Sequence, residues 1–312
     1  VFKEWGSTPY LEGVQVLPTR TDHLPFVGFE HGSMEREGLF VYPRADLAMC
    51  IIEKNGCSAW TTIWNKLTRN MLEIASPWYG VVPHHWSEES AASVFNRTST
   101  HRILWVRDPL ERFLSGFLDK CVVRDTEHSR HICSFNWFKN GTSTHADQSR
   151  FPLSRVRAWF EDGNGIMDAN THFTTQASHC ELTRRLKEYN IIGLMTKASF
   201  SRDASCILER VHQSVWNEQG GTDGKPFFTK PANPTMDARR NAEVLKKFYT
   251  REFAEFMMDI FREDYELFRL RKPEWVKHAT GEWFHEQHEV VSGEQEPKSR
   301  DLEALEAEED ED

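Results

Sequence analysis

Short apolar runs alternate along this chain with segments in which apolar residues recur every three or four positions. The first such run, at 48–53, has the length of a buried strand. A turn at 54–58 follows it, and helical spacing then extends from Ala59 to about Leu72. The apolar face of this helix is formed by Trp60, Ile63, Trp64, Leu67 and Met71. The order predicts a strand, a tight turn and a helix.

A second unit of the same kind lies further along the chain. Its strand is predicted at 102–106. Asp108, Pro109 and Glu111 then occupy the N-cap, first and third positions of a helix, where these residue types are favoured. This helix is expected to reach roughly Lys120. Since strands that alternate with helices favour parallel pairing, the sequence predicts an α/β fold with a P-loop-like central, mostly parallel sheet flanked by helices.

The remaining segments fit this fold class. Helical spacing is predicted at 153–162, 179–189, 204–216 and 236–270, and a short strand at 190–195. No internal repeat with a period of 20–50 residues is present, which excludes solenoids and propellers.

Three parts are predicted along the chain. Residues 1–44 form a loop and short-strand segment, residues 45–291 form the folded domain, and residues 292–312 form an acidic tail expected to be disordered. The formal charge is −10, but 301–312 alone carries eight acidic and no basic side chains, so residues 1–300 sum to −2. A nearly neutral body argues against nucleic acid as a partner.

Cysteines and sequons bear on the cellular compartment. None of the six cysteines forms a CxxC pair, which argues against a zinc ribbon or a thioredoxin-type site. Cys121, Cys133 and Cys180 flank polar segments and are candidates for a disulfide whose pairing the sequence leaves open. The glycosylation sequons at Asn96 and Asn140 favour the secretory pathway.

No run approaches 18 consecutive apolar residues, so no membrane span is predicted. The chain starts at Val1 without a methionine or a signal-peptide core, and we interpret it as a processed chain or one whose true N-terminus is missing, so that a membrane anchor could have been cut away.

The turn after the first strand has the composition of a phosphate-binding loop. Gly56 lets the backbone approach a ligand, Lys54 supplies a cation, and Ser58 with Thr61 or Thr62 supplies hydroxyls. An ordinary βα turn with a surface lysine is the alternative interpretation. The turn lacks the GxxxxGK motif, followed by Ser or Thr, of standard ATP and GTP sites.

The second turn offers a separate anion-binding group. Arg107 follows the carboxyl end of a predicted strand, where open α/β sheets bind ligands. Arg112 and Ser115 are three residues apart and share a helix face. The alternative is that Arg112 pairs with Glu111 or Asp119 on a solvated surface.

Together the two turns resemble a known family, the carbohydrate sulfotransferases. The segment Glu53-Lys-Asn-Gly-Cys-Ser-Ala-Trp60 is similar to their 5′-phosphosulfate loop, often P-K-x-G-C-S/T-x-W. Arg107-Asp-Pro-Leu-Glu-Arg-Phe-Leu-Ser-Gly-Phe117 resembles their 3′-phosphate motif, R-D-P-x-x-R-x-x-S-x-Y/F. Shorter resemblances follow in order at 170–176, 190–195 and 261–268.

The resemblance implies a donor and the residues that hold it. The family's donor is PAPS (3′-phosphoadenylyl sulfate), and the matching positions for its 5′-phosphosulfate are Lys54, Asn55, Gly56, Cys57, Ser58 and Ala59. Arg107 and Ser115 match the positions that hold the 3′-phosphate. Lys54 is expected to stabilise charge on the leaving phosphate, so that no metal is demanded. Glu53, Ala59 and Thr175 depart from the family pattern, which bears on the acceptor.

The acceptor hydroxyl requires a base. His172 is the first candidate, since imidazole titrates near neutral pH and its segment resembles a family motif. His84, His85 and Glu53 are the other candidates; Glu53 could instead pair with Lys54. A structural histidine is the alternative for His172, and Cys57 is expected to be packed rather than nucleophilic.

The sequence therefore predicts PAPS-dependent sulfuryl transfer to a hydroxyl of a glycan in the Golgi lumen. Two alternatives remain open at this point. One is a kinase-like nucleotide-dependent enzyme, and the other is a non-catalytic glycan-binding relative.

Overall fold

The computed structural model describes part of the 312-residue chain. The described residues are 10–12, 14–16, 38–42, 46–67, 92, 96–117, 119, 171–196, 199–220, 226–229 and 238–282. Several sequence predictions fall outside them: the histidines His84 and His85, the cysteines Cys121 and Cys133, the sequon at Asn140, the helix at 153–162 and the acidic tail. The domain boundaries also stay predictions.

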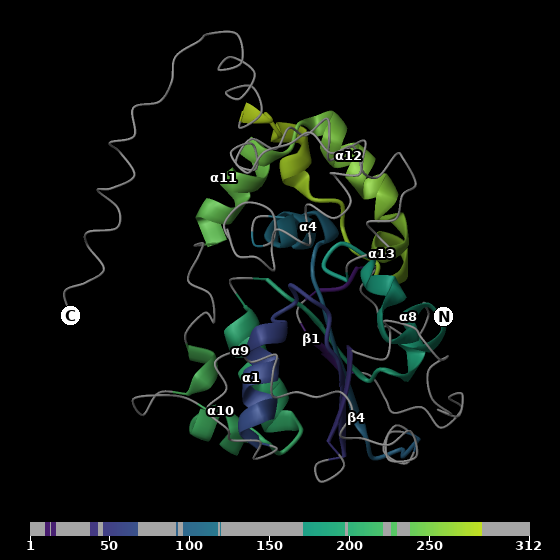
Figure 1. The fold of residues 1–312 in the computed structure, drawn as a ribbon, viewed down its shortest axis with the longest axis vertical. Coiled ribbons are helices and arrows are strands. Elements are labelled where there is room, and N and C mark those ends of the chain that lie inside the picture. Colours follow the sequence, from purple (N-terminus) through teal and green to yellow (C-terminus); the bar gives the residue numbers. More distant parts are fainter. Residues whose placement is uncertain are drawn as a thin grey trace, which may run out of the picture.

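Five strands form one sheet at the centre of the molecule (Figure 1). They are β1 (Val14–Val16), β2 (Leu39–Tyr42), β3 (Leu47–Cys50), β4 (His101–Val106) and β5 (Ile191–Leu194). Their order across the sheet is β1-β5-β4-β3-β2. The central strands β3, β4 and β5 are parallel, as predicted, whereas β1 and β2 run antiparallel at the two edges.

The central strands are buried on both faces, which explains why they are continuous apolar runs in the sequence. Successive residues of β4 point to opposite sides: Leu104 and Val106 join one apolar cluster, and Ile103 and Trp105 join the other. Each cluster is then completed by helices. The sheet is therefore the middle of three layers.

The described residues also form α-helices and short 3₁₀ turns. The helices of regular form are α1 (Cys57–Leu67), α4 (Pro109–Phe117), α8 (Leu182–Arg185), α9 (Phe200–Arg210), α10 (Ser214–Gly220), α11 (Ala238–Phe248), α12 (Arg251–Ile260) and α13 (Arg262–Leu267). Short 3₁₀ turns are η7 (Gln176–Glu181), η8 (Leu186–Glu188), η9 (Phe227–Thr229) and η10 (Glu274–His278).

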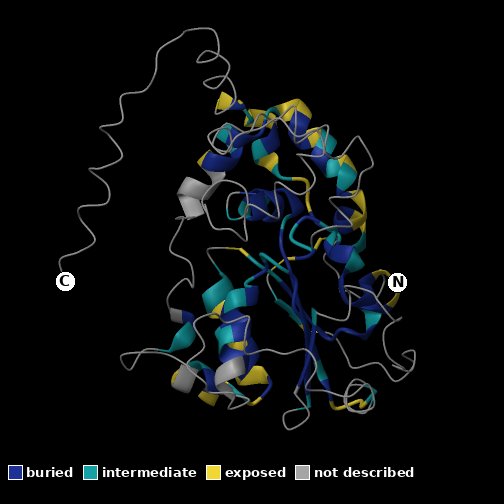
Figure 2. Ribbon diagram, in the orientation of Figure 1, coloured by how far each residue is buried: buried dark blue, intermediate teal, exposed yellow. Residues whose placement is uncertain are grey.

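Two groups of helices cover the two faces of the sheet (Figure 1). Helices α1, α9 and α10 pack on one face around Trp60 and Trp105. Helices α4, α11, α12 and α13 pack on the other around Phe113 and Phe248. In Figure 2 the strands and the inner sides of these helices are buried, and the exposed residues gather on the outer sides.

Some predicted helices are divided in the structure. The segment predicted at 204–216 is two helices, α9 and α10, separated at His212, which has a positive φ of 57°. The segment at 236–270 is three helices, and 179–189 is a short helix between two 3₁₀ turns. His212, in the left-handed region, ends α9 although it is neither glycine nor proline, whereas Phe261, between α12 and α13, has a negative φ of −94°. Apolar spacing alone marked neither break.

A disulfide joins Cys50 at the end of β3 to Cys180 in η7, across 130 residues of sequence. Cys180 was one of three candidates for a disulfide, and its partner Cys50 was not among them because it lies inside a buried strand. Among the described cysteines, Cys57 and Cys206 are free. No helix within the described ranges combines the length and apolar character needed to cross a bilayer.

Candidate functional site

The turn between β3 and α1 has a backbone that few residues tolerate. Lys54 and Gly56 both adopt positive φ angles, of 69° and 78°. A Cβ atom added at Gly56 would lie 2.4 Å from Cζ of Phe200, at the start of α9. Glycine is therefore required at position 56 both by the backbone and by the packing of the Phe200 ring.

Helix α1 begins directly after this glycine. The N–H groups of Ala59 and Trp60 donate to the carbonyl oxygen of Gly56 at 3.1 and 3.2 Å, which closes the first turn of the helix. A helix leaves its first N–H groups without acceptors in the helix and carries partial positive charge at this end. The start of α1, at Cys57 and Ser58, therefore has the character of an anion-binding site.

Lys54 and Arg107 lie together at the carboxyl ends of β3 and β4. Nη1 of Arg107 donates to the carbonyl oxygen of Lys54 at 3.1 Å. Nζ of Lys54 contacts Asp119 at 2.9 Å, and Nε of Arg107 lies 3.5 Å from Glu111. Both cations are thus oriented by carboxylates from the α4 side, and the two predicted anion-binding turns are in direct contact.

Arg112 does not take part in a surface ion pair. Its side chain is buried, and its guanidinium donates to three backbone carbonyl oxygens: that of Glu53 at 2.9 Å, Thr174 at 2.6 Å and Thr171 at 2.7 Å. The expected partners Glu111 and Asp119 instead contact Arg107 and Lys54. Arg112 therefore ties the first turn to the segment 171–176.

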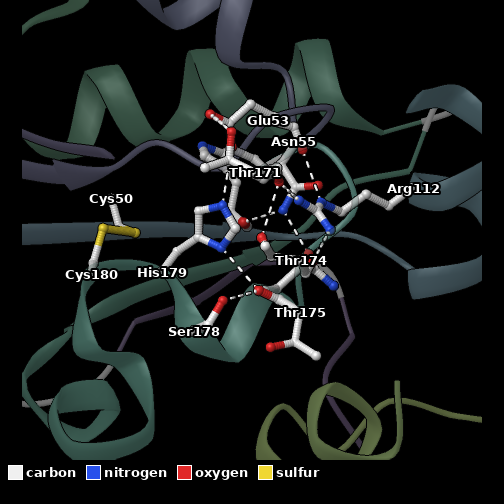
Figure 3. A network of polar contacts seen from close by, with 12 residues as sticks. Cys50, Glu53, Asn55, Arg112, Thr171, Thr174, Thr175, Ser178, His179 and Cys180 are labelled. Atoms are coloured by element: carbon white, nitrogen blue, oxygen red, sulfur yellow. Dashed lines mark hydrogen bonds and ion pairs between the residues drawn. A yellow bond between two sulfur atoms is a disulfide. The ribbon is translucent and has the colours of Figure 1, made fainter. Parts of the chain in front are cut away.

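Glu53 pairs with a histidine rather than with Lys54 (Figure 3). Its carboxylate accepts from Thr171 at 2.9 Å and lies 3.0 Å from Nε2 of His179. Nδ1 of the same ring lies 2.9 Å from the carbonyl oxygen of Thr175. Since that carbonyl can only accept, Nδ1 carries the hydrogen of this contact.

This environment changes the acidity of Glu53. Burial alone would raise the pKa of its carboxyl group, but the hydrogen bond and charge of His179, followed by the charges of His172 and Arg112, outweigh burial and hold the pKa well below its usual value of 4.5. A carboxylate of such low pKa is a weak proton acceptor. Glu53 therefore fits a structural role better than that of the base.

His172 lies on the segment that Arg112 ties to the first turn. It is half-buried, and its charge acts on Glu53, the residue before Lys54. Its carbonyl oxygen lies 3.3 Å from the position that a Cβ at Gly116 would take, so α4 passes close beneath it. The structure thus brings His172 to the neighbourhood of Glu53, the residue before Lys54, although the two are far apart in sequence.

The other predicted site residues differ in burial and in hydrogen-bond partners. Ser58 and Ser115 are half-buried. The amide of Asn55 points inward, with Nδ2 donating to the carbonyl of Trp105 at 2.9 Å and to Gln176 at 2.7 Å. Its backbone N–H donates to Ile52, and that of Ala59 to Gly56. Asn55 and Ala59 therefore shape the turn.

The two threonines of α1 that could supply hydroxyls differ in burial. Thr61 is fully buried, and Thr62 donates to the carbonyl of Ser58 at 2.8 Å. Burial, with the charge of Glu53, raises the pKa of the Cys57 thiol. A packed thiol of raised pKa agrees with the prediction that Cys57 is not a nucleophile.

Asp108 caps α4 as its sequence position predicts. Its Oδ1 accepts from the N–H of Glu111 at 3.0 Å, and its Oδ2 accepts from the hydroxyl of Tyr265 at 3.1 Å. Burial, with the charge of Glu111, raises the pKa of Asp108 to about 7. This carboxyl group is therefore partly protonated near neutral pH, next to Arg107.

Sequence reasoning missed the roles of Gln176 and Asp264. Both are fully buried, and the carboxylate of Asp264 accepts from the backbone N–H groups of Gln176 and Ala177 at 2.9 and 2.8 Å. Both stand in segments that resemble family motifs, which was the available signal. Within the described residues, no group of three or more His, Cys, Asp or Glu side chains is arranged to hold a metal ion.

Comparison with known proteins gives one match. The model of the sulfotransferase family matches residues 37–271, which include both turns, the segment 171–176 and α13. No curated protein and no solved structure matches the chain. Because the match covers well over half of the 312 residues, this chain belongs to the sulfotransferase family.

Proposed function

We propose that this sulfotransferase transfers a sulfuryl group from PAPS to a hydroxyl group of a glycan. The observation that carries the donor assignment is the direct contact between the two turns, in which Arg107 donates to the carbonyl of Lys54. A nucleotide with a phosphosulfate at one end and a phosphate at the other needs two cationic turns held at a fixed separation. The family match agrees with this chemistry.

Each turn has a separate task in the proposed reaction. The start of α1 and the ammonium group of Lys54 bind the 5′-phosphosulfate. Arg107 and Ser115 bind the 3′-phosphate, which ATP lacks. The acceptor oxygen forms a bond to sulfur while the bond from sulfur to the 5′-phosphate oxygen breaks, and that phosphate keeps the electron pair. Lys54 stabilises the charge that develops there.

His172 is the proposed base that removes the acceptor proton. It lies on the segment that Arg112 holds against the first turn. Glu53, the rival within the described residues, is occupied by Thr171 and His179 and has a lowered pKa. The rivals His84 and His85 lie outside the described residues. The His172→Ala variant tests whether His172 is the base.

We base the proposals of a glycan acceptor and of a location in the Golgi lumen on two features that are typical of the secretory pathway. The Cys50–Cys180 disulfide is typical of proteins from oxidising compartments. The sequon at Asn96 lies in a turn whose residues Arg97 and Thr98 are exposed. Sulfation of secreted glycans occurs where both features are found. A membrane anchor ahead of the domain stays part of this proposal.

A calorimetric titration tests the donor assignment. Adenosine 3′,5′-bisphosphate should bind and raise the melting temperature, and ADP at the same concentration should bind at least about tenfold more weakly because it cannot reach both turns. Equal binding of the two nucleotides would favour a kinase-like site. Absence of binding by either would contradict the donor site.

A further inference from the structure

We propose that Gln176, held by Asp264, is a positioning residue that sets the separation of the two anion-binding turns and thereby selects a nucleotide that spans them. The inference rests on the proposed donor site and adds what fixes its geometry. Neither side chain needs to touch the nucleotide.

Gln176 contacts both turns from the protein interior. Its Oε1 accepts from Nδ2 of Asn55 at 2.7 Å, in the first turn, and from the backbone N–H of Arg107 at 3.0 Å, in the second. Its Nε2 donates to the carbonyl of Arg107 at 2.8 Å and to Asp264 at 3.3 Å. Both lone pairs and both hydrogens of the amide are used, so its orientation is fixed.

The side-chain amide of Gln176 pairs with the backbone of Arg107 as a neighbouring strand would. At the end of β4 the carbonyl of Val106 still accepts from the N–H of Met195 at 2.7 Å, in the chain that continues β5. One residue later, the amide of Gln176 takes both the N–H and the carbonyl of Arg107. A primary amide offers a donor and an acceptor in one plane, as a neighbouring strand does. Glutamate and leucine cannot reproduce this pairing.

Asp264 holds Gln176 from the opposite side. Its two oxygens accept the backbone N–H groups of Gln176 and Ala177, and one also accepts from the Gln176 side chain. The next residue, Tyr265, donates to Asp108, the cap of the second turn. Helix α13, late in the sequence, therefore contacts both Gln176 and the second turn.

A fixed separation matters only to a ligand that contacts both turns. Binding at one turn places the second phosphate at the other without further loss of entropy, provided that the separation is correct. A less rigid separation should weaken the binding of a ligand that contacts both turns and leave the affinity of ligands that contact only one turn nearly unchanged. General loss of structure would weaken all of them alike.

The experiment compares three ligands on three proteins by calorimetry. The ligands are adenosine 3′,5′-bisphosphate, adenosine 5′-monophosphate and adenosine 3′-monophosphate. The variant is Gln176→Leu, and the matched control is Asn190→Leu. Asn190 is a buried amide at the other end of β4, where it accepts from the N–H of Arg102 at 2.8 Å and donates to Thr100 at 3.1 Å.

We expect the preference of Gln176→Leu for the bisphosphate over either monophosphate to fall by about tenfold or more, with the monophosphate affinities nearly unchanged. Asn190→Leu should lose thermal stability but keep the wild-type preference. An unchanged preference in Gln176→Leu, or an equal loss for all three ligands, would overturn the proposal.

Two further measurements keep the outcome clear. If Gln176→Leu does not fold, Asp264→Asn replaces it, because asparagine keeps one acceptor and the shape, and its preference should fall in the same direction. If the wild-type protein itself shows no preference for the bisphosphate, the proposed donor site fails and this inference fails with it. A wild-type preference that Asp264→Asn and Gln176→Leu both retain rejects the positioning role alone.

Discussion

At the scale of single residues, Lys54 combines strain with charge. Its backbone is in the left-handed region at φ 69°, which costs a non-glycine residue on the order of 1 kcal/mol. The conformation turns its carbonyl towards Arg107, while its ammonium group reaches Asp119. The strain therefore accompanies a contact between the two cationic turns.

Replacement of Lys54 tests its part in the reaction. Lys54→Ala should lower kcat by roughly a hundredfold or more, the scale of removing one charge-stabilising donor. The measurement is sulfuryl transfer from PAPS to a glycan acceptor at saturating donor. Lys247→Ala, which removes a partly exposed lysine of α11 that pairs with Glu282, is the control and should keep normal turnover. Near-normal kcat in Lys54→Ala would contradict the assignment.

Replacement of His172 tests the base. His172→Ala should lower kcat with little change in the affinity for adenosine 3′,5′-bisphosphate, because the base faces the acceptor and not the donor. The remaining activity should rise with pH as hydroxide takes over the proton. The exposed His278→Ala is a control for general effects of removing a histidine. A variant with nearly normal turnover removes His172 from the mechanism.

Residues marked by the composition of their own turn could be predicted from the sequence, and those whose role is set only by a distant contact could not. Lys54, Gly56 and Arg107 stand in turns whose composition points to anion binding. Arg112 and His179 act through contacts across 59 and 126 residues. Nothing near Arg112 in the sequence distinguishes a buried guanidinium that binds carbonyls from a surface ion pair.

At the scale of elements, helix starts were easier to predict than helix ends. Asp108 caps α4 with the predicted hydrogen bond to Glu111, because capping depends on neighbouring residues. The break between α11 and α12 also has a local cap, since the hydroxyl of Thr250 accepts from the N–H of Phe253, whereas Phe261, between α12 and α13, makes no side-chain cap. The edge strands β1 and β2 have three and four residues, too short for alternation to mark them as strands.

The disulfide gives a prediction about the element η7. Cys50–Cys180 ties η7, which carries Gln176 and His179, to β3. Cys180→Ala should lower the free energy of unfolding by about 2–5 kcal/mol, since the bond closes a loop of 130 residues in the unfolded chain. Denaturant unfolding followed by tryptophan fluorescence measures this change.

Reductant supplies the internal comparison for that experiment. Dithiothreitol should lower the stability of the wild-type protein towards that of Cys180→Ala and leave the variant unchanged. Cys206→Ser, at an exposed free cysteine, should behave as wild type in both conditions. If dithiothreitol destabilises Cys180→Ala as much as wild type, another bond is responsible.

At the scale of the whole molecule, the position of the site follows from the parallel centre of the sheet. Parallel strands place the ends of β3 and β4 at one edge, so two turns distant in sequence meet there. Helix α13 then holds the second turn through Tyr265, which donates to Asp108. Through Asp264 it also holds Gln176, which contacts both turns. The fold class and both turns were predictable, but this closure by the last helix was not.

The pH dependence of stability tests the electrostatics of this closure. The folded-state pKa of Asp108 is about 7, above its ordinary value of 3.8. Folding therefore favours the protonated group: its stabilising contribution is full below pH 3.8 and is lost as pH rises through 7. In Asp108→Asn, the amide can keep the cap and does not titrate. The free energy of unfolding of Asp108→Asn minus that of wild type should therefore increase from pH 4 to pH 7.5.

Glu53 should give the opposite slope, because its folded-state pKa lies below its ordinary value of 4.5. Its charged form stabilises the fold above pH 4.5, and this contribution is lost as pH falls below that value. Wild type should therefore exceed Glu53→Gln most clearly above pH 5, and the gap should narrow towards pH 3. Guanidinium unfolding at half-unit pH steps measures both variants. Slopes of the same sign would mean that one of the two carboxylates is not in the environment the structure gives it.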